Sequence, residues 1–260
     1  MSDRVPSKQT DQARIAKRIE RFIRDYVEAS STNGIVIGLS GGLDSAVVAK
    51  LAVNALGPER VSALILPASA TPEKDVVDAA DLASSLGIRY STIKIDPIIE
   101  RYSQVLPADE RAAGNLAARI RMGILYYHAA IKGYLVAGTS DKSERMIGYF
   151  TKFGDGAADL LPIADLYKTE VRALGSFLKI PKEIVEKKSS PRLWKDHLAE
   201  QEIGLAYDKM DPMLRLMEKK LPPAAIARKL KIPLAEVKKV EGLVKNSAHK
   251  RRPAPFAKPS

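Results

Sequence analysis

The sequence contains no cysteine and no long apolar run, and both absences limit what the chain can do. Without cysteine, disulfides, thiolate zinc sites, cysteine nucleophiles and persulfide chemistry are excluded. No apolar run approaches the ~20 residues that cross a bilayer, so we expect no membrane contact. The first residues lack the charged-then-apolar pattern of a secretory signal, so we expect a cytoplasmic protein. At 260 residues, 45% of them hydrophobic, the chain can bury one large core.

The formal net charge of +11 is concentrated at one end of the chain. Residues 1–213 hold 29 basic and 28 acidic side chains, whereas residues 214–260 hold 13 basic and 3 acidic ones. Such a basic end can bind RNA, bind an anionic small substrate, or keep a helical surface solvated, and charge does not decide among these. Phe256 is the one aromatic residue in this part of the sequence, too few for stacking on RNA bases, so we expect no nucleic-acid partner.

Short apolar segments alternate with amphipathic stretches along the first half of the chain. Apolar segments at 34–39, 61–66 and 134–139 are typical of buried strands, and residues 88–95 are predicted as a further strand between them. Helical spacing or cap signals mark the stretches between them, at 12–29, 43–56, 72–86 and 108–131, with Thr71 predicted as a helix cap. The alternation predicts an α/β fold, a doubly wound parallel sheet with flanking helices.

The second half of the chain begins with a long loop. Residues 149–162 lose periodicity and gain glycine and aspartate, which is typical of a functional loop. From 167 onward the pattern is helical and interrupted by proline. We therefore predict one domain made of an N-terminal helix (1–33), a nucleotide-binding α/β core (34–166), a helical region (167–250) and a Pro-rich tail (251–260).

The motif Ser40-Gly41-Gly42-Leu43-Asp44-Ser45 lies where the first predicted strand turns into a helix. Glycines there allow a ligand to approach the backbone, and the free N–H groups of the first helical turn attract phosphate oxygens. The Walker pattern is absent, because no Gly-Lys-Ser/Thr closes the loop. A carboxylate beside phosphates repels them unless a divalent cation lies between, so Asp44 is a candidate Mg2+ ligand. A tight turn with Asp44 stabilising the helix dipole is the structural alternative.

This motif resembles the Gly-rich loop of the ATP pyrophosphatases, which adenylate a carbonyl oxygen and release pyrophosphate. Further segments, in order and in register, are similar to the NAD synthetase family, most closely to its archaeal type, between Gly38 and Arg252. These segments are 118–122, Gly138-Thr139 with Glu144, 149–162, 166–170, 188–194, 202–208 and 249–251. The resemblance implies a Rossmann-like fold of the adenine nucleotide alpha hydrolase kind.

The resemblance also implies a reaction and its substrates. The chain would join ammonia to nicotinic acid adenine dinucleotide (deamido-NAD) with ATP, through an adenylated intermediate, and release AMP and pyrophosphate. Mg2+ would be the cofactor and a homodimer the assembly. Glutamine-dependent relatives use a cysteine amidase, which this cysteine-free chain lacks, so we expect free ammonia as the nitrogen donor.

Carried over position by position, the resemblance assigns a role to each matching residue. Asp44 and Glu144 would bind Mg2+, and Asp44, Lys168 and Asp159 would be catalytic. Deamido-NAD would contact Arg119, Lys152, Asp159, His249 and Lys250. ATP would contact Gly38, Leu39, Ser40, Gly41, Gly42, Leu43, Asp44, Ser45, Thr139, Lys168 and Ser190.

Several features leave alternatives open. Taken one at a time, Arg119, Lys152 and Lys168 are equally compatible with solvated surface charges. His128 is expected to be a packed or interface residue rather than a catalyst, and no catalytic role is assigned to His197. Ala199 stands where the family usually has an acid, which leaves the closure of the 194–204 loop undecided. An RNA-modifying ligase would use the same Gly-rich loop with the basic end, and a non-catalytic nucleotide-binding module would need neither Asp44 nor Glu144.

Overall fold

The computed structural model describes residues 8–192, 194 and 197–258. Its centre is a parallel sheet of four strands in the order β3-β2-β1-β4. The strands are β1 (Gly34–Gly38), β2 (Val61–Ile65), β3 (Arg89–Thr92) and β4 (Tyr134–Ala137). β1 pairs with β2 on one side and with β4 on the other, so residues 35–37 are paired within the sheet on both edges. The doubly wound α/β fold predicted from the alternating segments is confirmed.

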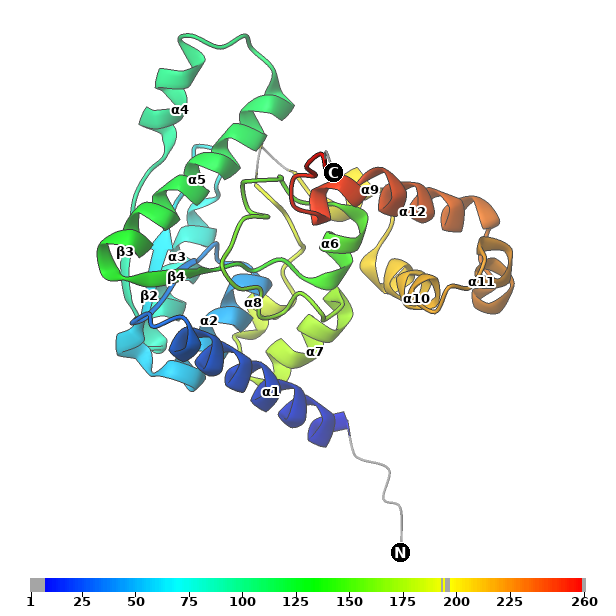
Figure 1. Cartoon of the computed structure of the whole chain (residues 1–260), viewed down its shortest axis with the longest axis horizontal. Helices are drawn as coiled ribbons and strands as arrows, with labels where there is room; N and C mark the ends of the chain where they lie inside the picture. The colour runs from blue at the N-terminus through cyan, green and yellow to red at the C-terminus, as the bar shows by residue number, and fades with distance from the viewer. Residues whose placement is uncertain (1–7, 193, 195–196, 259–260) are drawn as a thin grey trace, which may run out of the picture.

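Helices cover both faces of this sheet (Figure 1). Ile35 and Ile37 point into a core shared with helices α1, α2, α3, α7 and α8, whereas Val36, between them, packs in the core under α5. The near-continuous apolar strands follow from this burial on both faces. The helices of this body are α1 (Lys8–Ala29), α2 (Leu43–Leu56), α3 (Glu73–Ser85), α4 (Asp96–Ser103), α5 (Glu110–Lys132), α7 (Lys168–Phe177) and α8 (Lys182–Val185), with the 3-10 turn η1 (Pro58–Arg60).

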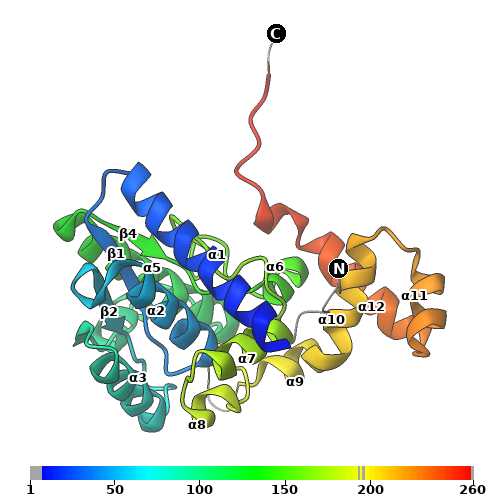
Figure 2. The ribbon, with the colours of Figure 1, turned by 90° about the horizontal axis from the view of Figure 1, so that it is seen from below.

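The C-terminal helices form a second apolar core beside the α/β body (Figure 2). Tyr207, Met210, Met213 and Leu214 are all fully buried there. The elements of this part are α9 (Ala199–Ile203), α10 (Tyr207–Glu218), α11 (Pro223–Leu230), α12 (Leu234–Asn246) and the 3-10 turn η2 (Ala248–Arg251). Helix α6 (Lys142–Ile147) contacts α7, α10 and α12, so it joins the two cores.

Two local expectations differ from the structure. The strand expected at 88–95 is shorter: β3, at the edge of the sheet, ends at Thr92, although the amides of Ile93 and Ile95 still donate to the carbonyls of Ile65 and Pro67. Thr71 does not cap the helix that follows. Its hydroxyl accepts a hydrogen bond from the Ala68 amide, and α3 begins after Pro72 with no side-chain cap. The side chain therefore closes a turn before the helix, an alternative that Thr offers as readily as capping.

The direction in which the chain winds changes between β1 and β4. From β1 the chain winds outward through β2 to β3 and then returns to add β4 on the opposite side of β1. Open α/β sheets bind ligands at this kind of switch point, beyond the carboxyl ends of the strands. The Gly-rich motif follows β1, and Gly138-Thr139 follows β4, so both motifs lie at this edge. Within the described ranges, no helix has the length and apolar character needed to cross a bilayer.

Candidate active site

The Gly-rich turn joins the end of β1 to the start of α2. Gly41 has a φ of +70°, and a Cβ there would collide with the Asp75 carbonyl oxygen, so glycine is required. Gly42 is the N-cap of α2 and makes no side-chain cap hydrogen bond, which leaves the first-turn N–H groups for a ligand. The Ser45 hydroxyl donates to the Gly42 carbonyl at 3.0 Å and accepts from the Ser40 amide at 3.3 Å. The turn is thus preorganised as an anion site.

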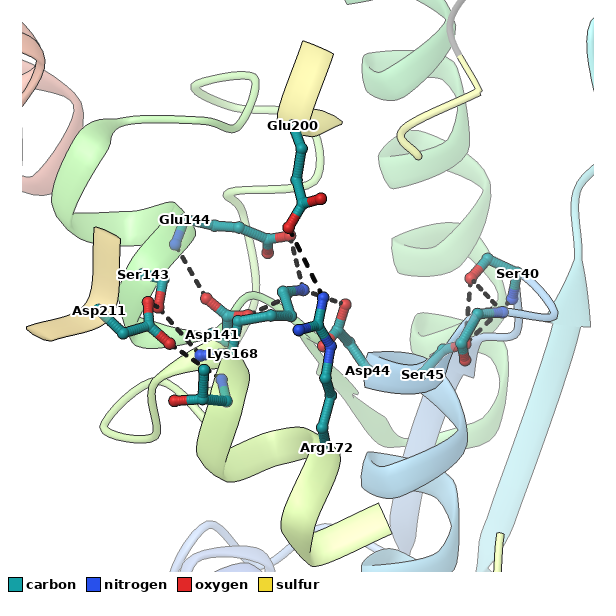
Figure 3. A network of polar contacts seen from close by, with 12 residues as sticks. Ser40, Asp44, Ser45, Asp141, Ser143, Glu144, Lys168, Arg172, Glu200 and Asp211 are labelled. Atoms are coloured by element: carbon teal, nitrogen blue, oxygen red, sulfur yellow. Dashed lines mark hydrogen bonds and ion pairs between the residues drawn. The ribbon is translucent and has the colours of Figure 1, made fainter. Parts of the chain in front are cut away.

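Three carboxylates gather beside this turn, from two different helices (Figure 3). Asp44 lies in the first turn of α2, while Asp141 caps α6 and Glu144 lies in its first turn. One oxygen from each lies within 4.8 Å of the others. Two helix N-termini therefore point their acidic first turns at a shared place next to the Gly-rich turn.

Lys168, the first residue of α7, is fully buried among these carboxylates. Its Nζ lies 2.7 Å from Asp44 Oδ2, 2.8 Å from Asp141 Oδ2 and 2.9 Å from Glu144 Oε1. Burial by itself would lower the pKa of Lys168, but the three neighbouring carboxylates raise it well above its usual value, so the ammonium stays charged. The lysine is a structural counter-ion at the centre of the site, not a solvated surface charge.

The acidic side chains carry more charge than Lys168 can balance. Burial raises the pKa of Asp141 to about 6 and that of Glu144 well above its usual value, with neighbouring carboxylates adding to the effect for both. Asp44 Oδ1 is buried, with no hydrogen-bond partner among the described residues. A buried carboxylate oxygen without a donor is costly unless a cation faces it. An all-oxygen set with excess negative charge is the donor chemistry that Mg2+ prefers, so these residues fit that ion.

Asp211 of α10, in the C-terminal core, contacts the residues next to Lys168 and Glu144. Asp211 Oδ1 accepts from the Ser143 hydroxyl at 2.6 Å, and Oδ2 accepts from the Thr169 amide at 2.9 Å. The same Ser143 hydroxyl accepts from the Lys168 amide at 2.9 Å. One buried carboxylate thereby fixes the start of α7 against α6, and with it the position of the Lys168 side chain.

A cavity of about 380 Å³ opens over the turn and the carboxylates. Most residues expected to bind ATP line it: Gly38, Leu39, Ser40, Gly42, Leu43, Asp44, Ser45, Thr139 and Ser190, together with Glu144. Gly41 is not among the lining residues, because it faces α3, and Lys168 lies behind the carboxylates. The part of the cavity toward α5 is lined by apolar side chains that include Leu66, Met122 and Leu125, which suits a flat aromatic base.

The residues expected to bind the dinucleotide do not all meet at this cavity. Arg119 donates to the Lys152 carbonyl at 3.3 Å, and Lys152 donates to the His249 carbonyl at 3.1 Å, so these three form a basic group outside the cavity lining. Lys250 does line the cavity, and its ammonium donates to the carbonyls of Gly148 and Phe150.

Asp159 lies apart from that basic group. Its Oδ2 accepts from the Val136 amide at 2.7 Å, and its Oδ1 accepts from the Tyr126 hydroxyl at 3.2 Å. Both contacts tie the 149–162 loop to the sheet and to α5. Each carboxylate oxygen thus already has a protein donor.

Two side chains at the site are absent from the residues that the sequence predicts there. Asp141 is not among the predicted residues, yet it stands three residues before Glu144, the spacing of a helix cap, and that signal could have found it. His197, to which the sequence assigns no catalytic role, lines the cavity, with its ring stacked on that of Trp194 at 3.5 Å and its Nε2 2.7 Å from Glu202. The Tyr149 hydroxyl donates to the same Glu202 at 2.8 Å. No local signal indicates that contact, because the two residues are 53 positions apart.

Comparisons with known proteins all point to one family. The family model for NAD synthase matches residues 15–254. The NH(3)-dependent NAD(+) synthetase of Hyperthermus butylicus is 48% identical over 250 residues, which cover 95% of this chain and 91% of the relative. The one from Methanocaldococcus jannaschii is 45% identical, with coverages of 91% and 93%.

Two solved structures are also similar over almost their whole length. The NMN synthetase from Francisella tularensis has a TM-score of 0.85 and 35% identity, and the match covers 95% of this chain and 98% of that one. The NH3-dependent NAD synthetase from Campylobacter jejuni has a TM-score of 0.82 and 31% identity, with coverages of 95% and 99%.

Proposed function

Because the chain belongs to the NAD synthase family, we propose that it amidates deamido-NAD with ammonia at the expense of ATP, and releases NAD+, AMP and pyrophosphate. The chain is a ligase of this family. One observation carries the assignment of the reaction to this cavity. The anion-binding turn at the end of β1 stands directly beside three carboxylates, so a nucleotide phosphate and a divalent cation can be held together.

The first step joins the two substrates. A carboxylate oxygen of the nicotinate ring attacks the α-phosphorus of ATP, a new P–O bond forms, and the bond to pyrophosphate breaks. The N–H groups of residues 42–45 hold the departing pyrophosphate, and Ser40 and Ser45 keep the turn in shape. The apolar part of the cavity would hold the adenine ring, and Thr139 and Ser190 lie where they can contact the rest of ATP.

Asp44 and Glu144 would hold Mg2+, and we add Asp141 to this set. The bound ion would neutralise phosphate charge and so make pyrophosphate a better leaving group. Lys168 keeps the three carboxylates from repelling one another and fixes their positions. Its role is therefore to arrange the acidic group as well as to contribute positive charge near the phosphates.

The second step forms the amide. Ammonia attacks the acyl carbon of the adenylate, the C–N bond forms, AMP leaves, and the proton lost from nitrogen passes to solvent or to a nearby base. No protein nucleophile takes part, so orientation of the two bound substrates supplies most of the acceleration. We retain Arg119, Lys152, Asp159, His249 and Lys250 as the deamido-NAD contacts.

Two further proposals concern assembly. Tyr127 and Ile131 on α5 are 67% and 68% exposed, which supports a homodimer formed through this helix. The helical part and the α/β body work as one unit, since Asp211 and Lys250 reach the site from the C-terminal side. The basic group would serve the anionic dinucleotide rather than RNA.

The proposed function is tested by incubating the chain with ATP, Mg2+, ammonium and deamido-NAD and measuring NAD+ and AMP by chromatography. Equal amounts of the two products are expected. Nicotinic acid mononucleotide replaces deamido-NAD in a parallel reaction, because one of the similar structures is an NMN synthetase. AMP formation without an amide product from either acceptor would overturn the proposal, as would salt-sensitive, sub-micromolar binding of tRNA in place of turnover.

A further inference from the structure

Lys187 holds the Gly-rich turn through its backbone, by a hydrogen bond to the Gly41 carbonyl oxygen. This lysine follows α8, and its Nζ donates to the Gly41 carbonyl oxygen at 2.7 Å. The same ammonium lies 2.9 Å from Asp75 Oδ1 and 2.5 Å from Asp78 Oδ2, both on α3. All three N–H donors of the ammonium therefore have acceptors.

The surroundings of Lys187 balance its charge. Asp75 and Asp78 are 4% and 9% exposed, so both ion pairs are largely shielded from water. Asp75 also accepts from Arg192 Nε at 2.8 Å, which ties the segment that carries Ser190 to the same helix. Although Lys187 contributes to the lining of the cavity, its ammonium is committed to α3 and to the turn.

The direction of the Gly41–Gly42 peptide follows from this contact. In a trans peptide the C=O and the following N–H point in opposite directions. Because Lys187 and α3 hold the Gly41 carbonyl, the Gly42 N–H points to the other side, where it meets the Ser40 hydroxyl at 3.3 Å. Two successive glycines give this peptide unusual freedom to rotate, since neither flanking residue has a Cβ. An external anchor is needed to keep one orientation.

We propose that Lys187, with Asp75 and Asp78, is a positioning group that locks the Gly41–Gly42 peptide, so that its N–H and the Ser40 hydroxyl that this N–H contacts stay on the side of the turn where the pyrophosphate of ATP binds. Lys187 acts on the phosphates through the backbone and not by touching them. The proposal rests on the proposed function, because it needs the terminal phosphates of a nucleotide in the turn.

The test measures binding of magnesium pyrophosphate and, separately, of AMP by calorimetry, without turnover. Lys187→Met is expected to weaken pyrophosphate binding roughly 10- to 100-fold, the effect of one misdirected hydrogen bond to a charged group, and to change AMP binding less than about twofold. Lys182→Met is the matched control, because Lys182 begins the short helix that precedes Lys187, is 82% exposed and lies 3.6 Å from Glu186. That control should bind both ligands as the unaltered chain does.

A second variant, Asp78→Asn, distinguishes a Lys187 that positions the peptide from a Lys187 that contacts the phosphates directly. It also replaces Lys187→Met in the test if that variant folds poorly. If Lys187 acts through the peptide, loosening its anchor weakens pyrophosphate binding. If Lys187 itself bound phosphate, freeing it from Asp78 would tighten binding, and that result would overturn the inference. Unchanged pyrophosphate binding in Lys187→Met would overturn it too. Failure of the unaltered chain to bind pyrophosphate would instead overturn the proposed function, and the inference with it.

Discussion

Replacing Lys168 by methionine tests the electrostatic design of the site. The substitution keeps the length and apolar stem of the side chain but removes the ammonium that contacts Asp44, Asp141 and Glu144 at 2.7–2.9 Å. Lys168 and Asp141 are both fully buried, so the Asp141 carboxylate would be left without its counter-ion in a place that water does not reach. Breaking a buried ion pair by removing one partner costs about 3–5 kcal/mol.

This cost is large compared with the stability of an ordinary domain. Free energies of unfolding are about 5–15 kcal/mol. Lys168→Met should therefore lose roughly a third or more of the free energy of unfolding, and its melting temperature should fall by about 10 °C. Lys142→Met is the control. Lys142 also contacts two carboxylates, of Asp165 and Glu218 at 2.8 Å, but it is partly exposed, and such pairs contribute at most about 1 kcal/mol.

Mg2+ should reverse the defect. The Lys168 ammonium donates hydrogen bonds to Asp44 Oδ2 and Glu144 Oε1, so replacing the lysine leaves these two oxygens available to a cation. Urea unfolding followed by circular dichroism, with and without millimolar Mg2+, should show a larger stabilisation of Lys168→Met than of the unaltered chain. Equal losses in Lys168→Met and Lys142→Met, or no selective gain with Mg2+, would refute the view that one buried lysine and one cation share these carboxylates.

Further outcomes are expected at the same site and at the basic end. Asp44→Asn and Glu144→Gln should fold normally but lose at least ~100-fold in kcat/KM under saturating Mg2+, and wild-type turnover by both variants would exclude them as metal ligands. Asp211→Asn should lower the unfolding free energy by about 1–3 kcal/mol, because one of its two buried acceptors becomes a donor, and chemical denaturation measures this. His249→Ala combined with Lys250→Ala should raise the KM for deamido-NAD more than that for ATP in steady-state assays. Ammonium, and not glutamine freed of ammonium, should support NAD+ formation; equal rates with both would contradict the expectation.

The local signals of the sequence determined the frame of the site. A continuous apolar strand followed by Ser40-Gly41-Gly42 and an amphipathic helix predicts an anion-binding turn, because strand, turn and helix are each encoded by neighbouring residues. Four such strands predict the parallel sheet, and the carboxyl ends of parallel strands necessarily share an edge. The sequence alone therefore places Asp44 and Thr139 at one edge of the sheet.

Only the tertiary structure shows which side chains from distant parts of the sequence reach the Gly-rich turn and Asp44. Lys168 reaches Asp44 across 124 positions, and Lys187 reaches Gly41 across 146. Neither contact leaves a local periodicity, because each depends on how α7 and α8 pack against α2 and α3. One lysine is buried among carboxylates and the other is anchored to a backbone carbonyl, although both look like solvated lysines in the sequence. The local sequence determines where each helix begins, whereas the packing of the helices determines which charges are buried together. Burial strengthens the interactions between those charges, because the effective dielectric constant is lower away from water.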